Sequence, residues 1–134
     1  MRTTSDINIT PNYVSWKGQD WRDKPAKRFI TNSTETFVTF KSGVNIEVEN
    51  IDFLKKGRPY EKGTKVVIER GATVHFKNAK FDNTVVNNGS ATFENCVFAT
   101  GEIENNGKAI YKGTTKEPKN IAKPKTMDKY ELLT

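Results

Sequence analysis

One pattern recurs four times between residues 43 and 113, and it restricts what this chain of 134 residues can fold into. Each copy begins with glycine and runs through alternating apolar and polar residues to a valine or an aromatic residue. In the first three copies an asparagine follows two places later, and a phenylalanine three places after that. The copies are GVNIEVENIDF (43–53), GATVHFKNAKF (71–81), GSATFENCVF (89–98) and GKAIYKG (107–113).

The repeat length is 17 or 18 residues. Gly71, Gly89 and Gly107 are 18 residues apart, and the longer first step comes from an insertion at 54–63. Apolar residues alternate with a period of two, and β-branched runs such as FVTF and KVVI precede the glycines, which indicates strands. Two or three short strands per 17–18 residues are typical of a β-solenoid. We therefore expect an all-β chain in which residues 37–113 form about four stacked coils.

The alignment of the copies predicts which side chains lie above one another. Stacked parallel strands lie about 4.8 Å apart, and at that distance opposite charges stabilise a pairing by about 0.2–1 kcal/mol. The predicted inward column contains Val48, Phe76, Phe93 and Tyr111. The residues that follow them alternate in sign, as in-register stacking favours: Glu49, Lys77, Glu94 and Lys112.

We interpret the recurrent asparagines and phenylalanines as structural. Asparagines at the same place in successive coils can pass hydrogen bonds along the stack as an amide ladder, and the phenylalanines fill the core. The ladder positions are Asn50, Asn78 and Asn95, with Phe53, Phe81 and Phe98 in the core. At the NNG corners we expect left-handed backbone, which Asn and Gly tolerate. Cys96 falls at an inward place, which predicts a buried thiol.

Residues 37–113, with a small Gly or Ala step followed by F-x-N-x-x-F, resemble the right-handed parallel β-helix superfamily of pectate-lyase-like solenoids. They are also similar to repeat segments of bacterial surface adhesins and autotransporter passengers. The resemblance implies a right-handed solenoid. It also implies secretion or surface display in bacteria or phage, and binding or scaffolding as often as catalysis.

The two ends of the chain lack the pattern. We interpret residues 1–36 as an irregular N-terminal cap, with Trp16 and Trp21 covering the first coil, because a solenoid must protect its open strand edges. The alternative is an exposed ligand patch in which basic residues surround the two indoles. Residues 114–134 are rich in Lys and Pro, which predicts a linker or tail.

The insertion at 54–63 is a second candidate ligand-binding site, because loops on a rigid scaffold commonly carry recognition. Four of its residues are basic, and Tyr60 could stack on a sugar or a base. The alternative is a solvated charged turn. The candidate residues of the loop are Lys55, Lys56, Arg58, Tyr60 and Lys62.

Catalysis is not expected. Enzymes on this fold need clustered carboxylates on adjacent coils, whereas Lys or His separates the outward ones here. No catalytic residue of the family can be placed on this sequence. One cysteine and one histidine cannot form a zinc cluster, and we predict no metal and no cofactor.

The leading hypothesis is a non-catalytic adhesion or recognition module of a bacterial surface or secreted protein, excised without its signal peptide. The formal charge of +6 favours anionic partners. We expect a glycan, a host extracellular protein or an anionic polymer as the partner, no nucleic acid and no membrane span. The alternatives are a structural phage or spacer component that assembles through its solenoid ends, and a degenerate carbohydrate-active enzyme.

Overall fold

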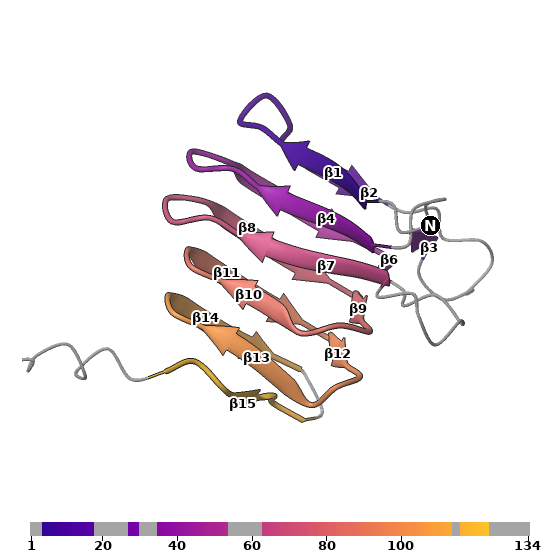
Figure 1. Cartoon of the computed structure of the whole chain (residues 1–134), viewed down its shortest axis with the longest axis vertical. Coiled ribbons are helices and arrows are strands. Elements are labelled where there is room, and N and C mark those ends of the chain that lie inside the picture. Colours follow the sequence, from indigo (N-terminus) through magenta and orange to yellow (C-terminus); the bar gives the residue numbers. More distant parts are fainter. Residues whose placement is uncertain (1–3, 18–26, 30–34, 54–62, 114–115, 124–134) are drawn as a thin grey trace, which may run out of the picture.

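The structure is a computed structural model that describes residues 4–17, 27–29, 35–53, 63–113 and 116–123 (Figure 1). All regular elements among these residues are β-strands, and none is a helix. The expected all-β class is therefore confirmed. The predicted loop site at 54–63 lies outside the described residues except for Gly63, and so does Trp21.

The strands form three sheets, and from β4 to β14 each strand lies beside the strand three places earlier in the chain, whereas β15 lies beside β13 (Figure 1). Sheet A contains β1 (Thr4–Ile9), β4 (Glu35–Phe40), β7 (Gly63–Ile68), β10 (Val85–Asn87), β13 (Glu102–Asn105) and β15 (Lys119–Asn120). Sheet B contains β2 (Ser15–Lys17), β5 (Asn45–Glu49), β8 (Thr73–Lys77), β11 (Ser90–Glu94) and β14 (Lys108–Lys112). Sheet C contains β3 (Lys27–Phe29), β6 (Ile51–Phe53), β9 (Lys80–Phe81) and β12 (Val97–Phe98).

Every strand pairing among the described residues is parallel. In sheets B and C, the four repeat copies pair in the register that their alignment predicts. In sheet B, Val48 pairs with Phe76, Phe76 with Phe93, and Phe93 with Tyr111. A slip of one residue would turn these rings outward, because the side-chain period of a strand is two. The periodicity of the sequence therefore fixes the pairing.

Aromatic rings form two stacked columns in the core. The rings of Phe76 and Phe93 are stacked with centroids 5.4 Å apart, and those of Phe53 and Phe81 with centroids 5.4 Å apart. The two columns meet edge to face, as in the 5.0 Å contact of Phe76 with Phe81. Offset-stacked and edge-to-face rings are the arrangements that the ring quadrupole favours.

The asparagines between sheets B and C owe their place to backbone conformation. Asn50, Asn78 and Asn95 have φ angles of 57°, 53° and 54°, the left-handed region that few residues other than Gly and Asn adopt. The fourth copy places Gly113 there, with φ of 60°. Within the predicted ladder, Asn78 Nδ2 donates to Asn50 Oδ1 at 3.3 Å.

The NNG corners differ from expectation, because none of their residues has a positive φ angle. Their amide ladder faces inward: Asn87 Nδ2 donates to Asn105 Oδ1 at 2.8 Å, and Asn87 is fully buried. Each of these two asparagines also accepts from the second residue after it, Gly89 N–H or Gly107 N–H. These bonds fold the chain into a tight corner without left-handed residues.

The N-terminal segment is more regular than the sequence predicts. In place of an irregular cap, its described part supplies one strand to each sheet, β1, β2 and β3. Trp16 pairs with Val48 in the inward column, and its ring lies edge to face with Phe53 at 5.7 Å. This segment therefore extends the repeat by one unit, which the sequence analysis missed.

The predicted tail also joins a sheet, because β15 pairs with β13. At the end of this strand, the side chain of Asn120 takes the place of a backbone partner for Asn105. Asn105 N–H donates to Asn120 Oδ1 at 2.9 Å, and Asn120 Nδ2 donates to the Asn105 carbonyl at 3.2 Å. An amide side chain thus covers the edge of β13.

Candidate recognition groove at the corner between sheets A and B

The corners that join sheet A to sheet B shorten along the chain, and the first of them, at 10–14, has five residues. The corners at 41–44 and 69–72 have four residues each, whereas those at 88–89 and 106–107 have two. The step from long to short lies between residues 69–72 and residues 88–89. Because successive corners are stacked, the apex of the 69–72 corner overhangs the shorter corner that follows.

Close packing under the long corner requires glycine. A Cβ atom on Gly89 would lie 2.5 Å from the carbonyl oxygens of both Glu69 and Ala72. The short corner is therefore held against the two ends of the long one, through bonds such as Ser90 N–H to the Ala72 carbonyl at 2.9 Å. The apex at Arg70 and Gly71 is left uncovered by it.

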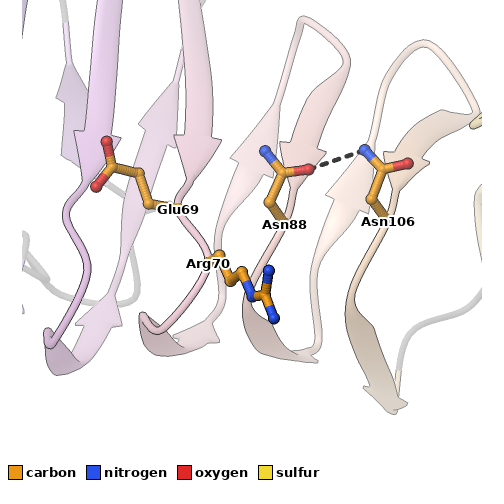
Figure 2. Close-up of a pocket in the computed structure, with 4 residues that line it drawn as sticks. All are labelled: Glu69, Arg70, Asn88 and Asn106. Atoms are coloured by element: carbon orange, nitrogen blue, oxygen red, sulfur yellow. Dashed lines mark hydrogen bonds between the residues drawn. The ribbon is translucent and has the colours of Figure 1, made fainter.

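The result is an open groove of about 740 Å³, which we call the corner groove. It is lined by Glu69, Arg70, Asn88 and Asn106 (Figure 2). Figure 2 shows the Glu69 carboxylate and the Arg70 guanidinium on opposite sides of their turn, with the guanidinium on the side of the two asparagines. Asn106 Nδ2 donates to Asn88 Oδ1 at 2.8 Å, which orients the Asn88 amide.

Glu69 bonds to the preceding corner. Its Oε2 accepts from Lys41 Nζ at 2.9 Å, and its Oε1 accepts from Ser42 N–H at 3.0 Å. The Lys41 hydrogen bond, followed by the Ser42 N–H bond, lowers the pKa of the Glu69 carboxyl from its usual value. The charge of Glu69 is therefore balanced by Lys41, which leaves Arg70 as the uncompensated charge of the groove.

The groove presents hydrogen-bond donors. Among the residues that the structure describes, the Arg70 guanidinium, the Arg70 and Gly71 backbone N–H groups and Asn88 Nδ2 have no hydrogen-bond partner. Arg70, Gly71 and Asn88 are exposed to solvent. A guanidinium and a primary amide donate several hydrogen bonds in fixed directions. The groove is therefore suited to a ligand that is rich in acceptors.

Other residues singled out from the sequence have structural surroundings. Trp16 is partly buried and packs against the core. Cys96 is buried, as predicted, and loss of hydration raises the pKa of its thiol to about 11. His75 Nε2 lies 2.9 Å from Glu94 Oε1, so its partner is Glu94 and not the Glu47 that stands beside it in the register.

The described part of the chain contains no group of three or more His, Cys, Asp or Glu side chains placed to hold a metal ion. It also contains no helix that is long and apolar enough to cross a membrane.

Comparisons with known proteins found no relative of this chain. No protein-family model, no characterised protein and no solved structure matches this chain. Its functional interpretation therefore rests on its own geometry.

The sequence analysis missed the corner groove, although a signal for it was present. The distance from the glycine to the inward column is five residues in the copies at Gly43 and Gly71, but four in those at Gly89 and Gly107. This shortening marks the change in corner length. Its consequence for the Arg70 and Gly71 N–H groups follows only from the stacked backbone.

Proposed function

We propose that the chain is a short right-handed parallel β-solenoid that serves as a non-catalytic adhesion or recognition module of a bacterial surface or secreted protein. The repeated visits to three parallel sheets support the solenoid, as does one hydrophobic core that draws residues from all three. The right hand is the one that nearly all connections between parallel strands of a sheet adopt.

We propose further that this module binds a glycan or a host protein through the corner groove. The observation that carries this proposal is the set of donors at Arg70, Gly71 and Asn88 that no described residue uses. They lie on turns of a rigid stack of strands, where recognition sites are commonly placed. The net charge of +6 favours an acidic partner.

A non-catalytic role is supported by the state of the carboxylates. Glycoside hydrolysis needs two carboxyl groups about 5–9.5 Å apart, of which one donates and one accepts a proton or attacks the sugar. The carboxylate that lines the groove, Glu69, is bonded to Lys41, and Glu94 on sheet B is bonded to His75. The Glu69 carboxyl, whose pKa is lowered by its bonds to Lys41 and to Ser42 N–H, is a poor proton donor at neutral pH.

The test is a screen of the full chain against a glycan array and an extracellular-matrix extract, repeated with variants. Arg70→Ala and Asn88→Ala are expected to weaken binding at least about tenfold, since each removes hydrogen bonds that involve a charged or fixed donor. Lys112→Ala is the matched control, because it removes an exposed cation of β14 away from the groove. Binding that survives both groove variants but is lost when residues 55–62 are deleted would assign recognition to that loop.

Self-assembly through the strand edges is a second candidate. Tyr111 and Ala109 on β14 and Phe98 on β12 are only partly buried, although they face the core. Against it, β15 and the Asn120 amide cover the edge of β13. Sedimentation velocity over a hundredfold concentration range tests whether the chain self-associates. A single monomeric species at all concentrations would reject assembly through the strand edges.

A further inference from the structure

The molecule contains its own example of a carboxylate bound at one of these corners. At the 41–44 corner, Ser42 N–H donates to Glu69 Oε1, Lys41 Nζ donates to Glu69 Oε2, and Gly43 N–H donates to the Gly71 carbonyl. All three donors are therefore satisfied by the next corner along the stack. Successive N–H groups in such turns form concavities that bind anions.

The 69–72 corner repeats this backbone. Both corners have four residues between strands that pair in register, so Arg70 corresponds to Ser42 and Gly71 to Gly43. Gly43 and Gly71 also share the same left-handed conformation, with φ of 92° and 91°. The Arg70 and Gly71 N–H groups therefore point along the stack toward Asn88, as those of Ser42 and Gly43 point toward the 69–72 corner.

The corner at 88–89 is too short to bond to the 69–72 corner in the way that the 69–72 corner bonds to the 41–44 corner. It supplies neither a carboxylate nor a carbonyl to these two N–H groups, and no other described residue bonds to them. The cation that Lys41 provides at the earlier corner is provided here by the Arg70 side chain. Asn88 Nδ2 adds a donor from the opposite wall of the groove.

We propose that the corner groove binds the carboxylate of a glutamate or aspartate side chain of a partner protein, through the Arg70 and Gly71 N–H groups, the Arg70 guanidinium and Asn88 Nδ2. This inference rests on the proposed function and names its ligand. The ligand carboxylate takes the place that Glu69 occupies on the preceding corner. A guanidinium matches a carboxylate through two parallel hydrogen bonds, which makes the pairing directional.

A protein carboxylate fits the groove better than a sugar does. The bound example is a glutamate side chain, so the spacing of the donors is already matched to that group. No aromatic residue is among those that line the groove, which are Glu69, Arg70, Asn88 and Asn106. Small-molecule sites are normally lined mostly by hydrophobic and aromatic side chains, whereas every residue that lines this groove is polar or charged.

The experiment is a titration of the ¹⁵N-labelled full chain with a blocked Gly/Ser peptide that contains two glutamates. We expect the Arg70 and Gly71 backbone amide signals and the Asn88 side-chain amide signals to move. The Ser42 and Gly43 signals serve as internal controls, because their N–H groups are already bonded. Arg70→Ala should weaken binding at least about tenfold, Lys112→Ala should leave it unchanged, and added salt should weaken it.

The same peptide with glutamines is the matched ligand control. Equal shifts with the glutamine peptide, or shifts away from Arg70, Gly71 and Asn88, would overturn the proposal. A uronate oligosaccharide that moves these signals while the glutamate peptide does not would also overturn it, yet would leave the proposed function intact. Loss of the proposed function would look different: partners from the screen would bind the Arg70→Ala chain as well as the unmodified one.

Discussion

The two long corners and the two short corners join the same pair of sheets, but they are stabilised in different ways. The long ones are held by contacts between corners, with Glu69 bonded to Lys41 and to Ser42 N–H. The short ones are held by buried amides and by glycines that permit backbone to pack on backbone. The difference shows that one repeat can change its corner without changing the register of its strands.

This comparison also explains where the groove lies. The two four-residue corners satisfy each other's hydrogen-bonding groups. The two short corners do the same through the bond between Asn88 and Asn106. At the junction of the 69–72 corner with the shorter 88–89 corner, the backbone N–H groups of Arg70 and Gly71 have no described partner. The mismatch of lengths is therefore the origin of the candidate site.

Among the variants that test this comparison, Gly89→Ala is expected to cause the largest loss in the free energy of unfolding. The new Cβ atom would lie 2.5 Å from two backbone oxygens that cannot move independently, so we expect a loss of about 3 kcal/mol in the free energy of unfolding. Gly71→Ala should cost about 1–2 kcal/mol, because it strains a positive φ angle and meets only the movable Ser42 side chain. Urea denaturation measures both, and equal losses would contradict the distinction between packing and conformation.

Asn87→Ala is expected to come next, at about 2 kcal/mol. It removes three hydrogen bonds and leaves partly buried groups such as the Lys108 carbonyl without the donor they have in the folded chain. Asn88→Ala, at the neighbouring exposed position, should change the free energy of unfolding by less than about 0.5 kcal/mol. If thermal unfolding showed similar losses for the two variants, the inward amide would not be the support of the short corner.

Glu69→Gln is expected to have the smallest effect, and one that depends on pH. Because the pKa of Glu69 is lowered in the folded chain, its carboxylate stabilises the fold above the unfolded pKa, near the usual 4.5. That contribution disappears as pH falls through the folded pKa. The difference in unfolding free energy between the two chains should therefore be present at pH 7 and shrink as the pH falls below 4.5, whereas a constant difference would exclude the ion pair as its cause.

Much of the fold could be predicted because it depends on local periodicity. Alternation of apolar and polar residues set the strands, and the spacing of Phe76 from Phe93 set the register. Trp16 was assigned to a cap and not to the inward column, because no asparagine and phenylalanine follow it at the usual places. Its neighbour Lys17 nonetheless continues the alternating charges, and its Nζ lies 3.9 Å from Glu49 Oε1.

The candidate site was less accessible to sequence reasoning. Tyr60 and Trp21 were selected as candidate binding residues because of the chemistry of their side chains. Their binding role stays a prediction, because both lie outside the described residues. The groove depends instead on the directions of backbone N–H groups at Arg70 and Gly71, and those directions appear only when corners are stacked. Residue type alone therefore carried little information about it.

The Asn120 amide has a consequence for how such a stack can grow. Like a peptide unit, the Asn120 amide has one acceptor and one donor that bond to the N–H and the carbonyl of Asn105. These groups at the end of β13 are therefore satisfied by a side chain and not by a backbone peptide unit. A whole extra repeat inserted between residues 113 and 116 would present the same acceptor and donor to this residue. Duplication of whole repeat units ahead of Asn120 is therefore the simplest route to a longer stack of strands.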